Sequence, residues 1–296
     1  MPERQNSDLR RLITERKKAK NARDRQQPVL IENREVFKRT LESKLPGLFS
    51  GRQMENFLKC GREEIFSTCK NCGTFEKFYF ACNRKWCPLC NWKISNQRAA
   101  HLRLWSQTIA QPKHLVLTMR NFPVLTRSKI RAFQKALLAL RRTKLFEQVK
   151  GGCASLEITN EGNGWHLHAH CLLDCRWLPA DQIAITWGKL IGQEFGIVKV
   201  KDVRGTDYVQ EISKYVAKGS ELAGWEPDLL LQFITAIKGC RFFCTFGSLR
   251  AKAKEIKRAV LALKGPGKVC ACGCSQFIYE TEASAILHDL RRQQRR

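Results

Sequence analysis

The sequence contains no apolar run as long as a membrane-spanning helix requires. Its first 25 residues also lack the apolar core of a secretory signal peptide. A loop of the type G-x-x-x-x-G-K, which binds nucleoside triphosphates, does not occur either, so a motor of that type is excluded. We therefore expect a cytoplasmic protein without membrane association.

Acidic residues are scarce, because 27 Asp and Glu stand against 53 Lys and Arg. The formal net charge is +26 and the sequence pI is about 9.9. Nucleic acid is the expected partner, since phosphate contacts with counterion release favour many spread cations. An anionic membrane surface is the alternative that charge alone leaves open.

Four regions differ in composition. Residues 1–55 are expected to form a basic arm, partly helical and partly disordered; a solvated helix without contacts is the simpler alternative. Residues 56–108 hold a cysteine-rich segment and a linking helix. Residues 109–250 alternate between strand and helix patterns, and residues 251–296 are a basic region with a candidate second cysteine-rich knuckle.

Apolar periodicity in the third region predicts the order β-α-β-β-α-β-α. The expected elements are a strand at 113–121, a helix at 126–150, a hairpin of strands at 153–160 and 166–173, a helix at 179–196, a strand at 197–203 and a helix at 207–219. This order predicts an α+β fold, in which an antiparallel sheet carries helices packed on one face, the split β-α-β type.

Fourteen cysteines are too many for a disulfide framework in a chain without a secretion signal, so metal thiolates are expected. Two C-x-x-C pairs, Cys69 with Cys72 and Cys87 with Cys90, are separated by fourteen residues. Each C-x-x-C turn directs both sulfurs at one point. The two pairs therefore predict one structural Zn²⁺ site in a small zinc-binding module.

The other cysteines allow more than one interpretation. Cys60 and Cys82 are surplus, and each is either a buried small residue or a substitute zinc ligand. A further group either binds a second zinc ion or binds no metal at all. Its members are Cys240, Cys244, Cys270, Cys272 and Cys274.

Three of the six histidines alternate in GWHLHAHCLL, residues 164–173. On a strand, His166, His168 and His170 share one face, while the apolar residues between them share the other. Three imidazoles on one face predict a divalent-metal site. Metals that handle phosphates usually take an oxygen ligand too, and Glu157 on the neighbouring hairpin strand is the candidate, although it could be an ordinary strand carboxylate.

The segment EISKYVAK places Glu211 beside Tyr215, because residues four apart are neighbours on a helix. Lys214 and Lys218 lie on an adjoining strip and flank the tyrosine. A phenol has a pKa of about 10 and attacks poorly unless a base or nearby cations favour the phenolate. On their own these residues would be structural, and only the neighbouring metal site makes Tyr215 a candidate nucleophile.

In their order along the chain, these motifs resemble those of the HUH endonucleases, and most of all the rolling-circle replication initiators of small plasmids and single-stranded DNA phages. VLTMRN is similar to the first motif, HAHCLL to the His-hydrophobic-His motif, and KYVAK to the motif of the nucleophilic tyrosine. The upstream NRKWCPLC also resembles the cysteine-rich segment that precedes the nuclease in such initiators and in one class of rolling-circle transposases. The resemblance covers about residues 60 to 250 and implies an HUH nuclease fold.

For the metal site, the resemblance implies that His168 and His170 bind Mg²⁺ or Mn²⁺ and that Glu157 is the acidic third ligand. It leaves His166 as an additional ligand or a phosphate contact.

For the reaction, the resemblance implies that Tyr215 attacks the scissile phosphate, with Lys218 beside it, and leaves a 5′-phosphotyrosine and a free 3′-OH. Glu211 stands where some members carry a second tyrosine. In single-tyrosine plasmid initiators a glutamate there is thought to activate water, or to orient the closing attack, and so to end replication.

The implied function is nicking of the origin strand of a plasmid or phage, on single-stranded or hairpin DNA with flanking duplex. A host helicase and polymerase would be needed to unwind and copy the strand. Two alternatives remain, a rolling-circle transposase with the same chemistry and a zinc-containing DNA-binding regulator. The sequence does not predict the oligomeric state.

Overall fold

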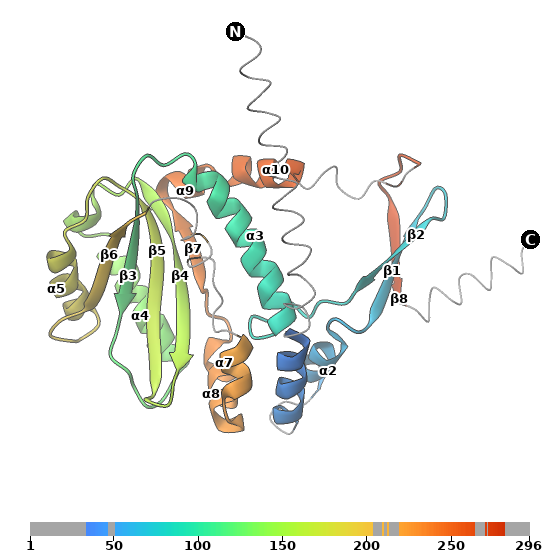
Figure 1. Cartoon of the computed structure of the whole chain (residues 1–296), viewed down its shortest axis with the longest axis horizontal. Helices are drawn as coiled ribbons and strands as arrows, with labels where there is room; N and C mark the ends of the chain where they lie inside the picture. Colours follow the sequence, from blue (N-terminus) through green and yellow to red (C-terminus); the bar gives the residue numbers. More distant parts are fainter. Residues whose placement is uncertain are drawn as a thin grey trace, which may run out of the picture.

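Two antiparallel sheets organise the part of the chain that the structure describes, one of five strands and one of three. In Figure 1 the five-stranded sheet lies on the left and the three-stranded sheet on the right, with the long helix α3 (Pro88–Ser106) between them. The computed structural model describes residues 34–46, 51–203, 209, 212, 219–263, 270 and 272–281.

The five-stranded sheet has the order β6-β3-β5-β4-β7, and every neighbouring pair is antiparallel. Its strands are β3 (Pro112–Thr118), β4 (Gly151–Asn160), β5 (Trp165–Asp174), β6 (Ile197–Asp202) and β7 (Phe243–Phe246). Strands β4 and β5 form the predicted hairpin and lie at the centre of the sheet. The predicted α+β class with an antiparallel sheet is therefore confirmed.

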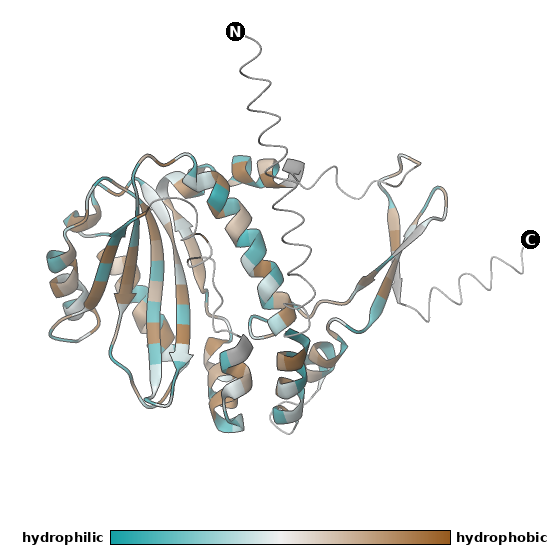
Figure 2. Ribbon diagram, viewed as in Figure 1, coloured by the Kyte–Doolittle hydropathy of each residue, from teal (hydrophilic) through white to brown (hydrophobic). Residues whose placement is uncertain are grey.

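Three helices cover one face of this sheet, namely α4 (Arg127–Leu140), α5 (Ala180–Leu190) and α8 (Pro227–Ile237). Strand alternation directs apolar side chains to that face, and they form one buried cluster with the helices. The strand members include Leu115, Leu117, Leu156, Ile158, Leu167 and Ala169. Figure 2 shows hydrophobic and hydrophilic bands along β4 and β5, as this alternation requires.

Helix α4 begins where the sequence predicts but ends ten residues earlier than the predicted helix. Thr126 caps its start by accepting a hydrogen bond from the backbone N–H of Lys129. At the other end the hydroxyl of Thr143 donates to the carbonyl of Leu140, and a short 3₁₀ turn, η1 (Lys144–Phe146), follows. A side chain that satisfies the last carbonyls competes with continued helix, so the expected extension to residue 150 was wrong.

The opposite face of the sheet carries a second buried cluster. Cys153 of β4 and Leu172 of β5 join side chains from α3 and α10 (Ala253–Leu263), which follows the short helix α9 (Gly247–Ala251). Val209 and Ile212 are helical, fully buried and part of this cluster. Because residues i and i+2 share a face, this is also the face of His168 and His170.

The three-stranded sheet joins residues from both ends of the described chain. Its order is β2-β1-β8, formed by β1 (Glu64–Cys69), β2 (Phe75–Tyr79) and β8 (Phe277–Thr281). Helix α2 (Arg52–Lys59) precedes it, and α7 (Gly219–Gly224) lies beside α8 in Figure 1. No helix in the described ranges is long and apolar enough to cross a membrane.

Candidate active site and cysteine cluster

The candidate metal site lies on the face of the five-stranded sheet that carries the histidines. Glu157 of β4 stands directly opposite His168 of β5, and His170 is the next residue of β5 on that face. The Nε2 atoms of His168 and His170 lie 2.8 Å and 3.3 Å from Oε2 of Glu157. Ligands at neighbouring positions around a small divalent cation are about 3 Å apart. The three side chains therefore converge as a cation site requires, and their role as ligands stays a prediction.

Burial and hydrogen bonding act in opposite directions on Glu157. Burial would raise the pKa of this carboxyl, but the hydrogen bonds and charges of His168 and His170 outweigh it and lower the pKa. Glu157 is therefore ionised, which is the state in which a carboxylate binds a cation. Two imidazoles and one carboxylate form a donor set that can hold a divalent cation.

A fourth histidine supports this site from the adjacent strand. His114 of β3 is buried, and its Nε2 lies 3.1 Å from Nδ1 of His170. A hydrogen bond at Nδ1 fixes the tautomer and orientation of an imidazole and leaves Nε2 for a metal. The motif pattern did not single out His114. Its only signal was a polar residue within an apolar strand, KHLVLTMRN.

His166 lies at the edge of the site and outside the converging group. Its ring centroid is 5.2 Å from that of His168, and burial together with the charge of His168 lowers the pKa of His166. The structure therefore separates His166 from His168 and His170, which the alternation alone could not do. The predicted reaction residues Tyr215, Glu211 and Lys218 lie outside the described residues.

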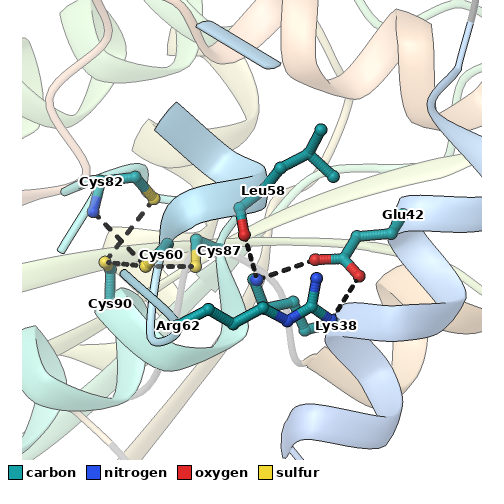
Figure 3. A network of polar contacts seen from close by, with 8 residues as sticks. All are labelled: Lys38, Glu42, Leu58, Cys60, Arg62, Cys82, Cys87 and Cys90. Carbon is teal, nitrogen blue, oxygen red and sulfur yellow. Dashed lines mark hydrogen bonds and ion pairs between the residues drawn. The ribbon is translucent and has the colours of Figure 1, made fainter. Parts of the chain in front are cut away.

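Four cysteines converge at the start of α3, as Figure 3 shows. Cys60 follows α2, Cys82 follows β2, Cys87 is the N-cap of α3, and Cys90 lies in the first turn of α3. The Sγ atoms are 3.7 Å apart for Cys60 and Cys87, 3.5 Å for Cys60 and Cys90, and 3.7 Å for Cys82 and Cys90. A tetrahedral zinc ion with Zn–S bonds of about 2.3 Å holds its sulfurs about 3.8 Å apart. The geometry fits a structural zinc site.

Backbone amides support the sulfurs of this cluster. The N–H of Cys82 donates to Sγ of Cys60 at 3.4 Å, and the N–H of Asn83 donates to Sγ of Cys90 at 3.2 Å. Such bonds orient metal ligands and stabilise thiolates. Hydrogen bonds from Cys82, Cys87 and Cys90 also lower the pKa of Cys60.

The expected zinc tetrad is divided between two places. Cys87 and Cys90 lie with Cys60 and Cys82, whereas Cys69 and Cys72 lie with C-terminal cysteines. The expected pairing of the two C-x-x-C motifs was wrong because the β1–β2 hairpin intervenes. Its strands have six and five residues, which places the turn at 69–72 about 17 Å from the base.

A buried lysine anchors the first described helix, residues 34–44, beside this cluster (Figure 3). Lys38 is only 2% exposed, and its Nζ lies 2.7 Å from Oε1 of Glu42 and donates to the carbonyl of Leu58 at 3.2 Å. Arg62 pairs with Oε2 of Glu42 at 2.7 Å. This part of the predicted N-terminal arm is therefore packed rather than free in solvent.

Comparison with known proteins gives two family matches. Residues 77–177 match a family described as "Replication protein", and this range contains Glu157, His168 and His170. Residues 33–119 match a family described as "Transposase zinc-binding domain", which contains Cys60, Cys82, Cys87 and Cys90. The two ranges overlap, in keeping with a core that includes both the cysteine cluster and the sheet.

A curated protein named "Protein rep", from Lactiplantibacillus plantarum, is 28% identical over 210 residues. The match covers 60% of this chain and 66% of that relative, so somewhat less than two thirds of the relative is spanned. No solved structure matches the chain. These matches support the sequence resemblance: parts of the chain are similar to a family of replication proteins, to a transposase zinc-binding domain and to "Protein rep".

Proposed function

We propose that this replication protein nicks the origin strand of a plasmid or phage by tyrosine attack and frees a 3′-OH for rolling-circle synthesis. The observation that carries the proposal is the convergence of Glu157, His168 and His170 on the central hairpin of an antiparallel sheet. Two imidazoles and a carboxylate on a rigid sheet suit the binding of a cation that activates a phosphate.

The side chains of Glu157, His168 and His170 would hold Mg²⁺ or Mn²⁺. When bound, this ion would polarise the scissile phosphate and offset its charge. Glu157 supplies the negative charge of the site, and His114 holds the ring of His170 in the orientation that leaves Nε2 available.

Tyr215 is the proposed nucleophile. Its phenol oxygen would attack phosphorus, the bond from phosphorus to the 3′ oxygen would break, and that oxygen would leave as a 3′-OH after taking up a proton. Val209 and Ile212, which precede Tyr215 in the sequence, belong to the same buried cluster as Leu172, two residues from His170 on one strand face. This position supports the proposal that Tyr215 acts on a phosphate held at that face.

The proposed substrate is single-stranded or hairpin DNA with flanking duplex. Helix α4 buries its apolar side and exposes Arg127, Lys129, Arg131 and Lys135. Exposed cations of this kind bind the phosphate backbone without reading sequence. A host helicase and polymerase would supply unwinding and synthesis in the cytoplasm.

The test of the proposal is a covalent adduct. Purified protein is incubated with Mn²⁺ and labelled hairpin oligonucleotides tiled across the replicon that encodes it, and denaturing electrophoresis detects DNA that migrates with the protein. We expect an adduct with one hairpin and none after addition of excess chelator. Absence of an adduct on every hairpin of the replicon would contradict the proposal.

His114→Ala is expected to weaken Mn²⁺ binding by about 10- to 100-fold, as loss of a residue that orients a metal ligand commonly does. His114→Gln should recover part of the affinity, because its amide can still hydrogen-bond to Nδ1 of His170. Mn²⁺ titration followed by electron paramagnetic resonance measures the affinity of both variants, and circular dichroism checks that they fold. Equal affinity in wild type and His114→Ala would refute this positioning role.

Glu211→Ala is expected to leave the first cleavage intact and to slow release of the protein from DNA. The reason is that Glu211 is proposed to activate water for the closing step, while Tyr215 opens the strand. Single-turnover assays measure adduct formation and adduct decay separately. An equal loss in both steps would remove this role from Glu211.

A rolling-circle transposase is the second candidate, favoured by the match of residues 33–119 to a transposase zinc-binding domain. Both candidates predict a tyrosyl adduct. They differ in the following step, because a transposase joins the cleaved strand to a second DNA molecule. A strand-transfer assay with element termini, set beside a nicking assay on a supercoiled plasmid origin, distinguishes them.

A further inference from the structure

Four further cysteines form a second cluster where the N-terminal and C-terminal parts of the chain meet. Cys69 ends β1 and Cys72 lies in the turn after it, while Cys270 and Cys272 come from the turn before β8, which lies beside it in Figure 1. The Sγ atoms are 3.7 Å apart for Cys69 and Cys272, and 3.2 Å for Cys72 and Cys270. These spacings are close to the roughly 3.8 Å of a tetrahedral zinc–thiolate site.

The two turns differ in length by one residue, but both end in a glycine whose N–H bonds back to the carbonyl of the first cysteine. Gly73 and Gly273 each follow the second cysteine of their turn and have φ angles of 74° and 83°. Glycine adopts this conformation without a steric penalty, whereas other residues rarely do. The N–H of Gly73 donates to the carbonyl of Cys69 at 3.0 Å, and the N–H of Gly273 donates to the carbonyl of Cys270 at 2.8 Å. Each turn therefore directs two sulfurs toward one point.

Hydrogen bonds also connect the two turns to each other. The N–H of Lys70 donates to the carbonyl of Gln276 at 3.0 Å. The side-chain amide of Asn71 donates to Sγ of Cys272 at 3.6 Å, a contact that orients a sulfur ligand. In the antiparallel register Cys69 pairs with Phe277, so the strands themselves bring the turns together.

We propose that Cys69, Cys72, Cys270 and Cys272 bind a second structural zinc ion, which fastens the C-terminal strand β8 to the β1–β2 hairpin. Four thiolates at tetrahedral spacing select Zn²⁺ over Mg²⁺ or Mn²⁺, which prefer oxygen ligands. The paired ligands are 198 and 203 positions apart in the sequence, so the ion closes a loop that contains the entire five-stranded sheet.

The three-stranded sheet needs such support because it has little core of its own. Among the side chains of β1, β2 and β8 whose burial the structure describes, only Ser67 and Cys69 are buried. Small sheets without a hydrophobic face are marginal in water. Metal binding therefore contributes directly to the folding of this part of the chain.

The two cysteine clusters differ in the solvent exposure of their cysteines, and this difference allows the second zinc site to be tested. In the cluster at α3, Cys60, Cys87 and Cys90 are buried, whereas Cys72 and Cys272 of the second cluster are exposed. Native mass spectrometry of the full chain, purified under anaerobic conditions, should find two zinc ions per chain. A chromogenic chelator should remove them in two steps, the second cluster losing its ion first.

Two matched variants show which cysteine cluster loses its zinc ion in the faster step. Cys272→Ser should leave one zinc ion per chain, remove the fast step and expose β8 to limited proteolysis. Cys274→Ser is the control, because Cys274 lies two residues away but outside the four converging sulfurs, and it should keep two ions.

One zinc ion in the wild-type chain would overturn the proposal, and so would two ions in Cys272→Ser. Recovery of a disulfide between Cys72 and Cys270 in the anaerobic protein would overturn it as well. The wild-type measurements do not depend on any variant folding. They are also independent of nicking activity, so the second zinc site and the proposed function can fail separately.

Discussion

Tyr215→Phe is expected to abolish the covalent protein–DNA adduct, with a loss on the order of 10³-fold or more, because it removes the attacking oxygen. Phenylalanine keeps the ring, so packing should change little. The measurement is adduct formation with Mn²⁺ and the hairpin that wild-type protein cleaves. Circular dichroism and affinity for the uncleaved hairpin should remain near those of wild type.

The control for this experiment comes from the low tyrosine content of the chain, which has only four. Tyr208→Phe removes the same hydroxyl group seven positions earlier and should retain the adduct. An adduct that persists in Tyr215→Phe and disappears in Tyr208→Phe would identify Tyr208 as the nucleophile. An adduct that persists in both variants would exclude both tyrosines as the nucleophile.

His168→Ala and His170→Ala are each expected to lower metal-dependent cleavage by about 10²-fold or more, because each removes one of three converging ligands. His166→Ala is the matched control, since it removes the same side chain from the same strand face outside the converging group. His166→Ala should lower metal-dependent cleavage less than His168→Ala or His170→Ala does. Mn²⁺ affinity and cleavage rate are measured on all three proteins.

An equal loss in all three variants would contradict the distinction between His166 and the other two histidines. A loss of cleavage without a loss of Mn²⁺ affinity in His170→Ala would show that this residue is not a ligand.

Four strands of the five-stranded sheet could be predicted because their signals are local. Alternation along residues 153–160 and 166–173 and the short turn between them predicted a hairpin, and pairing in register places Glu157 opposite His168. The end of α4 was missed because it depends on one hydrogen bond from Thr143, which apolar periodicity does not contain.

The cysteine ligands could not be grouped from spacing alone. Two C-x-x-C motifs at the expected distance are typical of one zinc site, but the β1–β2 hairpin separates them. Cys60 and Cys82 appeared as surplus, yet the hairpin base brings them to Cys87 and Cys90. The return of β8 to β1 joins segments about 200 positions apart, and no local pattern carries that information.

His114 was missed for a related reason. Its contact with His170 depends on the register between β3 and β5, which sets His114 opposite Leu172 and diagonal to His170. A single histidine in an apolar strand is usually a packing residue, and only the pairing gives it a positioning role.

Mass spectrometry of the nucleotide-linked peptide tests the central claim most directly. Wild-type protein is allowed to form the adduct with Mn²⁺, the DNA is trimmed by nuclease, and the protein is digested and sequenced. We expect one modified peptide, with the 5′ phosphate on Tyr215. A phosphate on any other residue, or cleaved DNA with no modified peptide, would contradict it.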